Sequence, residues 1–363
     1  MSDNKKDLEY MKKALELAES VKGTTFPNPA VGAVIVSQDI VVGAGATKKC
    51  GDDHAEKTAL KNAQKKALGA TMYVTLEPCS HHGRTAPCVD MIIDAGIKRV
   101  FVAVKDPNPL VSGKGIETLR KAGVEVITGL LSKEATRVNE DFFWDITKKR
   151  SWITLKLALT LDGRVADARG KSKWITSADS RDFVQELRRR HAAIGVGLNT
   201  LREDNPRLTA RCKKTFFPAR IVFAPDRNIP QESLFLLNAS ETRSIVVLRG
   251  GKRGIETSPA GVEFWNTGVT DPHESLFSFV EMAHEQHISS LFVEGGQRLA
   301  SLFMESGLVN RLYFFYGNKI VGSGKDGLLF SHGLDIGNSI TLRDAEHRIF
   351  GSDMMITGIP EYK

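Results

Sequence analysis

One imidazole, one carboxylate and two thiols follow one another in the first quarter of the chain, in an order that suits a catalytic zinc ion. A single residue separates His54 from Glu56, and Cys79 and Cys88 come downstream. Three protein ligands leave the fourth tetrahedral position of zinc to water, as in catalytic rather than structural sites. We therefore predict that His54, Cys79 and Cys88 bind one Zn²⁺ ion.

Glu56 has the position of a proton shuttle. Side chains at i and i+2 do not share a helix face, so His54 and Glu56 reach one metal only at the first turn of a helix. Hydrolysis of an amidine-like C–NH2 group needs a proton on the departing nitrogen, which a carboxylic acid can deliver. The order of these residues is that of zinc deaminases acting on aminated heterocycles.

The spacing of the two cysteines differs from the generic deaminase signature. Eight residues separate Cys79 from Cys88, where the generic signature has two. The intervening segment, 80–87, is therefore predicted to form a substrate-specific loop across the site. A position beside a helix N-terminus would favour the thiolate form of both cysteines.

Other interpretations of these residues stay open. His54 could cap a helix while Cys79 and Cys88 are ordinary buried residues. His81 or His82, adjacent on a polar loop, could compete as ligands. The two remaining cysteines, Cys50 and Cys212, have no matched partners and are expected to be structural.

Length and composition bound the class of protein. A chain of 363 residues exceeds what one core usually organises, so two domains are expected. With 41% hydrophobic residues, no long apolar run and no leader-like start, the chain is expected to be soluble, cytoplasmic and free of membrane contact. The net charge of +7 is thinly spread, as in basic enzymes of phosphorylated metabolites, so nucleic acid is not an expected partner.

Helical and strand-like patterns alternate along the chain, which predicts two α/β domains over residues 1–147 and 148–363. The first domain is expected to hold helices over 7–21, 54–66, 88–95 and 115–122, and strands over 30–36, 40–46, 71–76, 99–104 and 124–128. Strands of the second are expected over 152–159, 192–196, 220–223, 244–248, 290–294 and 311–316, with 249–272 left as loop with short strands.

Motifs in both halves resemble the bifunctional deaminase/reductase family of riboflavin biosynthesis. In the first half these are Pro27-Asn28-Pro29, His54-Ala55-Glu56, Leu76-Glu77-Pro78-Cys79-Ser80-His81, Gly83-Arg84-Thr85 and Asp106-Pro107-Asn108-Pro109. In the second half they are Lys156-Leu157-Ala158, Leu161-Asp162-Gly163-Arg164, Trp174-Ile175-Thr176-Ser177, Asp204-Asn205-Pro206-Arg207-Leu208-Thr209 and Val293-Glu294-Gly295-Gly296.

The resemblance implies a cytidine-deaminase-like three-layer α/β/α domain followed by a dihydrofolate-reductase-like α/β domain. It also implies two successive reactions on one phosphorylated pyrimidine. The first is zinc-dependent removal of the 2-amino group of 2,5-diamino-6-(5-phosphoribosylamino)pyrimidin-4-one. The second is NADPH reduction of the ribosyl side chain to give 5-amino-6-(5-phosphoribitylamino)uracil. A homo-oligomer, dimer or tetramer, is expected.

The resemblance also implies roles for individual residues. Glu56 is the catalytic residue beside the zinc ligands, and the deaminase substrate is bound by Asn28, Arg84, Thr85, Asp106 and Asn108. The reductase substrate is bound by Ser172, Arg188, Leu208, Arg211 and Glu294. NADPH is bound by Ala158, Trp174, Thr200, Asp204, Gly296, Gln297, Arg298, Leu299, Ala300, Ser301 and Leu302.

Some of these reductase roles also have a simpler alternative. Backbone N–H groups after Gly296 could bind a pyrophosphate at a helix start, yet glycines are common at such turns for backbone reasons alone. Arg188 offers a planar fork for phosphate but begins a basic run that is by default a solvated helix face. Trp174 could pack on the nicotinamide or belong to the core. No G-x-G-x-x-G motif supports a standard dinucleotide site.

Three positions depart from the family pattern, namely Ala86, Asn318 and Asn199, and they bear more on the reductase than on the deaminase. Two other functions remain as alternatives. The second half could be a scaffold that has lost hydride transfer, or the chain could be an RNA-binding adenosine deaminase.

Overall fold

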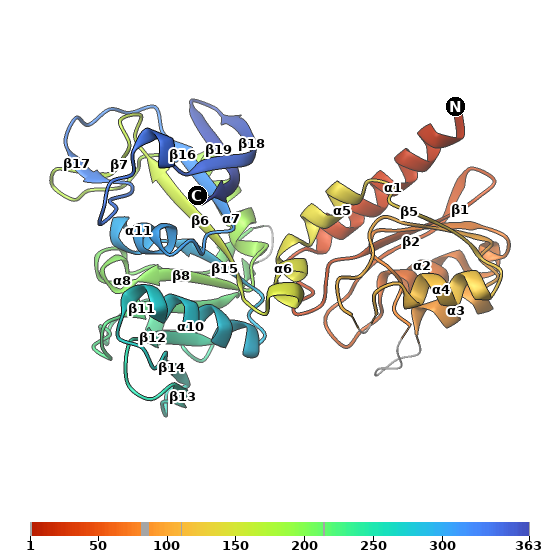
Figure 1. The fold of residues 1–363 in the computed structure, drawn as a ribbon, viewed down its shortest axis with the longest axis horizontal. Coiled ribbons are helices and arrows are strands. Elements are labelled where there is room, and N and C mark those ends of the chain that lie inside the picture. The colour runs from red at the N-terminus through yellow and green to blue at the C-terminus, as the bar shows by residue number, and fades with distance from the viewer. Residues whose placement is uncertain (1, 81–86, 110, 213–214, 363) are drawn as a thin grey trace. The chain divides into compact units, whose positions relative to one another are not determined.

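The computed structural model describes residues 2–80, 87–109, 111–212 and 215–362, which form two compact units. The first unit comprises Met1–Lys148 and the second Lys149–Lys363. Each unit is a sheet with helices on both faces (Figure 1). Within the described residues, no helix is long and apolar enough to cross a membrane.

The sheet of the first unit has five strands in the order β2-β1-β3-β4-β5. Strand β1 (Gly32–Ser37) pairs antiparallel with both β2 (Ile40–Ala46) and β3 (Thr71–Val74). Strands β4 (Arg99–Val102) and β5 (Glu125–Thr128) extend the sheet parallel to β3. The predicted hairpin and the three strands that follow it are thus confirmed, with ends shifted by a few residues.

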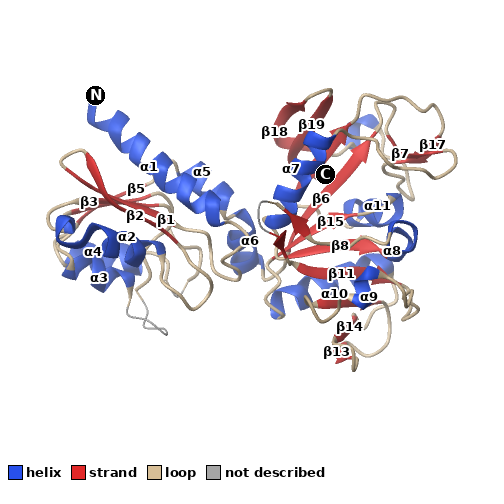
Figure 2. Ribbon diagram, turned by 180° about the vertical axis from the view of Figure 1, so that it is seen from behind, coloured by secondary structure: helices blue, strands red, loops and turns tan. Residues whose placement is uncertain are grey.

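Helices cover both faces of this sheet, which gives three layers (Figure 2). Helices α1 (Ser2–Val21) and α5 (Ser132–Val138) pack on one face. Helices α2 (Ala55–Ala63), α3 (Cys88–Asp94) and α4 (Lys114–Lys121) pack on the other. A 3-10 turn, η1 (Gln64–Ala67), follows α2, and α6 (Glu140–Lys148) ends the unit. The sequence patterns did not predict α5 and α6.

Glycines in β2 bring α2 close to the sheet. A Cβ atom at Gly45 would lie 2.5 Å from the carbonyl oxygen of Ala55, and one at Gly43 would lie 2.3 Å from that of Ala59. Residues without a Cβ are therefore required for this close approach. The first turn of α2, which carries Glu56, is held directly against the sheet by this packing.

The second unit is built on a ten-stranded sheet in the order β13-β14-β12-β11-β8-β15-β6-β16-β19-β18. Its strands are β6 (Trp152–Leu159), β8 (Ala193–Gly197), β11 (Ala219–Ala224), β12 (Ser244–Leu248), β13 (Gly254–Thr257), β14 (Val262–Asn266), β15 (Ser290–Glu294), β16 (Arg311–Tyr316), β18 (Thr341–Phe350) and β19 (Asp353–Glu361). All six predicted strands are present. The hairpin β18-β19 was not predicted.

Helices again cover both faces, and two small sheets complete the unit. The helices are α7 (Ala178–Arg189), α8 (Leu198–Asp204), α9 (Leu234–Leu237), α10 (Pro272–Glu285), α11 (Gln297–Glu305) and the 3-10 turn η2 (Ile336–Asn338). The small sheets pair β7 (Arg164–Asp167) with β17 (Gly324–Asp326), and β9 (Ala210–Arg211) with β10 (Thr215–Phe216). Helices α10 and α11 share one core with the central strands.

Parallel pairing places the functional candidates of the second unit at one edge of its sheet. Strands β8, β15 and β6 are adjacent and parallel, so their carboxyl ends meet. Ligands of open α/β sheets bind outside the carboxyl ends of the strands. Glu294 ends β15, Ala158 lies near the end of β6, and Thr200 follows β8 by a few residues.

A buried asparagine fixes the segment that carries Asn28. The side chain of Asn139 accepts a hydrogen bond from the Ala30 N–H at 2.8 Å and donates one to the Ala30 carbonyl at 2.8 Å. Next to it, Lys22 forms an ion pair with Asp141, and both side chains are almost completely buried. Residues 22–30 are therefore tied to the start of α6.

We predict that Asn139→Ala lowers the free energy of unfolding by about 2–4 kcal/mol, because two buried backbone groups of Ala30 lose their partner. Asn62→Ala is the matched control, since Asn62 donates one exposed hydrogen bond to the Ala44 carbonyl. Calorimetry of the full chain measures both. Equal melting temperatures for the two variants would contradict the stabilising role of the Asn139 side chain.

Candidate functional site

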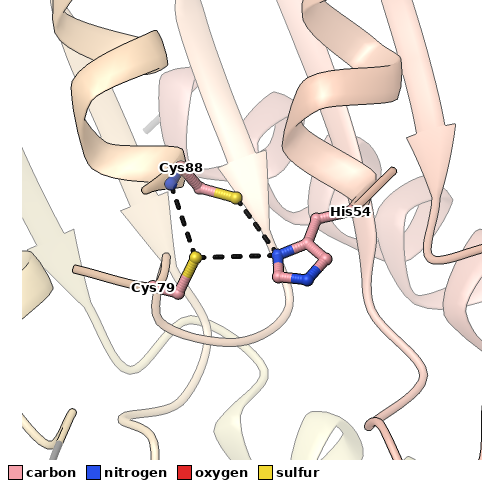
Figure 3. Close-up of side chains that lie close together, drawn as sticks. All are labelled: His54, Cys79 and Cys88. Atoms are coloured by element: carbon pink, nitrogen blue, oxygen red, sulfur yellow. Dashed lines mark hydrogen bonds between the residues drawn. The ribbon is translucent and has the colours of Figure 1, made fainter. Parts of the chain in front are cut away.

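Three side chains from separate segments of the first unit point at one another (Figure 3). The Cys79 sulfur lies 3.6 Å from Nδ1 of His54, and the Cys88 sulfur lies 3.3 Å from the same nitrogen. The Cys88 backbone N–H also donates to the Cys79 sulfur at 3.4 Å. The ligand atoms of all three residues lie within 4.8 Å of one another.

Two helix starts and one strand end supply these ligands. His54 is the N-cap residue of α2, and Glu56 lies in the first turn of that helix, as the spacing of the two residues predicted. Cys88 is the first residue of α3. Cys79 comes five residues after β3 and points at the start of α3. His54 does stand at the N-cap of α2, but its side chain makes no capping hydrogen bond. The alternative that it is unrelated to the two cysteines is wrong, because the three side chains converge.

The cluster fits a tetrahedral zinc ion. Zn–S bonds of about 2.3 Å and Zn–N bonds of about 2.0–2.1 Å put a sulfur and a nitrogen ligand about 3.6 Å apart. The two S···N distances, 3.6 Å and 3.3 Å, agree with this separation. One nitrogen and two sulfurs are also the donor set expected of a catalytic zinc with a fourth position for water.

Burial sets the protonation of the groups around the cluster. Glu56 is only 4% exposed, and burial, followed by the negative charge of Cys79, raises its pKa to about 7. Hydrogen bonds from Cys88 and then His54 lower the pKa of Cys79 to about 4, and the same contact with Cys79 raises the pKa of Cys88.

The candidate substrate residues of this unit lie on two loops. Asn28 is partly buried, next to the segment held by Asn139. Asp106 and Asn108 follow β4, and the Asn108 N–H donates to the Asp106 carboxylate at 2.8 Å. The remaining candidates of the loop between the cysteines, together with the Ala86 departure, lie outside the described residues: His81, His82, Arg84 and Thr85.

In the second unit, Arg188 and Glu294 form an ion pair that leaves each side chain less than 15% exposed. Two guanidinium nitrogens of Arg188 donate to the two Glu294 oxygens, one at 2.9 Å, and the third donates to the Thr209 carbonyl at 3.1 Å. The alternative that Arg188 belongs to a solvated helix face is therefore wrong. Because its fork is occupied by a carboxylate, Arg188 is less available to a phosphate than the exposed Arg211.

Lys156 joins this pair, and sequence reasoning assigned it no role. It lies opposite Glu294 in the pairing of β6 with β15. Burial raises the pKa of Glu294, whereas the positive charges of Arg188 and Lys156 lower it. The charges have the larger effect, so the pKa of Glu294 is lowered. Burial lowers the pKa of Lys156. A lysine inside the mostly apolar run of β6 was the available signal.

Several cofactor candidates meet at the start of α11. The N–H of Gly296, the N-cap residue of α11, donates to the Thr200 hydroxyl at 3.3 Å, and no side chain caps this helix start. Free N–H groups at a helix start fit a pyrophosphate. Gln297, Arg298 and Leu299 form the first turn. Ala300 and Ser301 are buried, and the Ser301 hydroxyl accepts a hydrogen bond from the Leu329 N–H, whereas Leu302 is partly buried.

Other candidates of the second unit lie on its loops, except Asp204, which ends helix α8. Trp174 is 59% exposed, so its interpretation as a core residue is wrong, and the Arg181 guanidinium stacks 4.3 Å from its ring centroid. Asp204 forms an ion pair with Lys173 at 2.8 Å. Ser172 is partly buried, and Leu208 is 1% exposed, so a ligand at Leu208 would meet its backbone.

The raised pKa of Glu56 predicts a pH-dependent stability in the metal-free protein. The pKa of Glu56 is about 7 in the folded protein, against an ordinary value of 4.5. The contribution of the protonated carboxyl to the free energy of unfolding is therefore complete below pH 4.5 and is lost as pH rises through 7. Glu56→Gln should therefore gain stability over the wild type across this window, by about 3 kcal/mol at pH 8. Thermal unfolding after chelation measures the difference at each pH.

Glu117→Gln, which removes an exposed carboxylate of α4, is the control and should show no such growing difference. A difference between Glu56→Gln and the wild type that stays constant from pH 4 to pH 8 would show that Glu56 does not titrate in this window.

Two family models match the chain in succession. The model described as the cytidine and deoxycytidylate deaminase zinc-binding region matches residues 4–104. The model described as the RibD C-terminal domain matches residues 151–356. The fold is thus a cytidine-deaminase-like three-layer α/β/α domain followed by a dihydrofolate-reductase-like α/β domain, as the family resemblance implied.

Relatives match over nearly the whole chain. The riboflavin biosynthesis protein RibD of Aquifex aeolicus is 46% identical over 88% of both chains, and that of Escherichia coli is 37% identical over 96% of this chain and 97% of its own. A solved structure from Thermotoga maritima, titled a diaminohydroxyphosphoribosylaminopyrimidine deaminase/5-amino-6-(5-phosphoribosylamino)uracil reductase, is 37% identical. It has a TM-score of 0.86 and covers 99% of both chains. The chain belongs to the RibD family of riboflavin biosynthesis proteins.

Proposed function

We propose that this chain catalyses two successive steps of riboflavin biosynthesis. Residues 1–147 deaminate 2,5-diamino-6-(5-phosphoribosylamino)pyrimidin-4-one, and residues 148–363 reduce the product with NADPH to 5-amino-6-(5-phosphoribitylamino)uracil. The convergence of His54, Cys79 and Cys88 beside the buried Glu56 carries the proposal for the first step. Membership of the RibD family supplies the substrate.

In the deamination, the chain holds the metal and moves one proton. His54 and the two thiolates would hold zinc, which when bound supplies an activated water as nucleophile at neutral pH. Glu56 accepts the proton of the attacking water and returns it to the 2-amino nitrogen, which leaves as ammonia. A pKa near 7 suits a group that must accept and then release a proton at neutral pH.

The substrate is held by groups on the two flanking loops. Asn28, Asp106 and Asn108 offer amide and carboxylate partners for the polar edge of a pyrimidine. Arg84 and Thr85 complete this set, and an arginine suits the 5-phosphate because its planar fork matches phosphate geometry.

In the reduction, NADPH when bound supplies the hydride. The first turn of α11 offers backbone N–H groups to its pyrophosphate, beside the Gly296 N–H that donates to the Thr200 hydroxyl. The exposed Arg211 is available to the phosphate of the substrate, while Glu294, fixed by Arg188 and beside Lys156, faces the ribosyl chain. Asp204, the last residue of α8, pairs with Lys173, the neighbour of Trp174 in the chain.

Two further features of the chain belong to the proposal. We infer a cytoplasmic location, because thiolate ligands persist in a reducing compartment. We also infer a homo-oligomer, either dimer or tetramer, because the edge strand β18 is long and Ile349 on it is 62% exposed. Light scattering of the purified protein measures its mass.

Glu56→Gln tests the deaminase assignment. The amide cannot accept the proton, so we expect deamination to fall by at least a hundredfold while zinc content stays at one equivalent. NADPH oxidation on supplied deaminated intermediate should be unchanged.

Arg211→Ala and Lys156→Met should have the reverse effect, with deamination retained and reduction lost. Loss of both activities in any one variant would contradict two independent sites, and absence of NADPH oxidation in the wild type would favour the scaffold alternative.

A further inference from the structure

The carboxylate of Glu77 is buried beside the metal cluster and has no part in the chemistry described above. It is 4% exposed and stands two residues before Cys79. One of its oxygens, Oε2, accepts hydrogen bonds from the N–H groups of Asp106 at 3.2 Å and Gly113 at 2.9 Å. The other, Oε1, accepts from Gly115 at 3.0 Å and Ile116 at 3.2 Å.

These four donors span the segment from the end of β4 to the first turn of α4. Gly113, the N-cap residue of α4, offers no side chain to cap the helix. The Glu77 side chain caps the helix instead, although Glu77 is distant in sequence. Two of the four N–H groups that donate to it belong to the first turn of α4. The same carboxylate holds the start of the connecting loop at Asp106.

The packing around Gly115 shows how closely the two segments are joined. A Cβ atom on Gly115 would lie 2.2 Å from the carbonyl oxygen of Pro78 and 3.2 Å from Oε1 of Glu77. The helix start therefore lies directly on the peptide that leads into Cys79. The Glu77 N–H also donates to the Val104 carbonyl at 3.0 Å, which fixes the same segment to the end of β4.

The loop held in this way carries two of the proposed substrate residues. Asp106 donates its N–H to Glu77, and its own carboxylate accepts a hydrogen bond from the Asn108 N–H at 2.8 Å. One buried carboxylate thus holds the backbone of Asp106 by a direct hydrogen bond, and through Asp106 it also holds that of Asn108. That carboxylate belongs to the segment that supplies a metal ligand.

We propose that Glu77 is a positioning residue for the deamination. Its carboxylate fixes the loop of Asp106 and Asn108 to the segment of Cys79, so that the metal and the substrate-binding side chains keep one relative geometry. The inference rests on the proposed deaminase function of this unit. Errors of about 1 Å in such a geometry cost about a hundredfold in rate.

Glu77→Gln tests the inference in the zinc-loaded full chain. The amide presents one oxygen and one NH2 group, so two of the four N–H donors lose their acceptor. We expect the KM for the deaminase substrate to rise at least tenfold at one equivalent of zinc, with reductase activity unchanged. In a double-mutant cycle, Asn108→Ala should add little to the effect of Glu77→Gln, because the first change already misplaces Asn108.

Two further variants separate positioning from stability. Arg120→Met removes a hydrogen bond to the Val126 carbonyl at the other end of α4 and should lower the melting temperature without changing KM. Gly115→Ala keeps Glu77 but pushes the helix start away from Pro78, and should raise KM as Glu77→Gln does. An unchanged KM in zinc-loaded Glu77→Gln, multiplicative effects in the cycle, or loss of zinc from Glu77→Gln would overturn the proposal.

Hydrogen exchange of the four amides that donate to Glu77, those of Asp106, Gly113, Gly115 and Ile116, provides a readout that does not require turnover. These amides should exchange faster in zinc-loaded Glu77→Gln than in the wild type, whereas exchange as slow as in the wild type would overturn the inference. If the wild type itself does not deaminate the substrate, the proposed function fails, and the exchange rates still decide whether Glu77 holds the loop.

Discussion

The first unit depends on the convergence of one imidazole nitrogen and two sulfurs on a single point. His54 is the N-cap residue of α2, Cys88 begins α3, and Cys79 follows a strand, so the three ligands meet only when the sheet and both helices are packed. The close approach of α2 to β2 at Gly45 sets the first of these positions. Metal binding and folding of this unit are therefore coupled, because the unfolded chain has no such site.

In the second unit, the corresponding constraint is a group of buried charges. Burying an arginine and a carboxylate costs free energy of hydration, which can exceed the attraction between the two charges. A buried ion pair is therefore weak evidence that the two residues stabilise the fold. The pair of Arg188 and Glu294, with Lys156 opposite, lies at the carboxyl edge of three adjacent parallel strands. That edge is where such sheets bind their ligands, so the location favours a functional role for these charges.

Much of this arrangement could be predicted from the sequence, and the exceptions have physical reasons. Buried apolar strands such as Trp152–Leu159 and Ser244–Leu248 were predicted with their observed ends, because both faces of these strands are covered. The exposed strand β18 lacks an apolar pattern and was missed. The metal ligands follow from residue type and spacing. The pairing of Arg188 with Glu294 and the contacts of Glu77 could not be predicted, because their partners come from distant parts of the chain.

X-ray absorption at the zinc edge of the purified, zinc-loaded protein tests the central claim most directly. The geometry of His54, Cys79 and Cys88 predicts two sulfur neighbours at about 2.3 Å and two nitrogen or oxygen neighbours at about 2.0–2.1 Å, the imidazole and one water. The sulfur signal should halve in Cys79→Ser. A zinc ion without sulfur neighbours, or with four of them, would contradict the account.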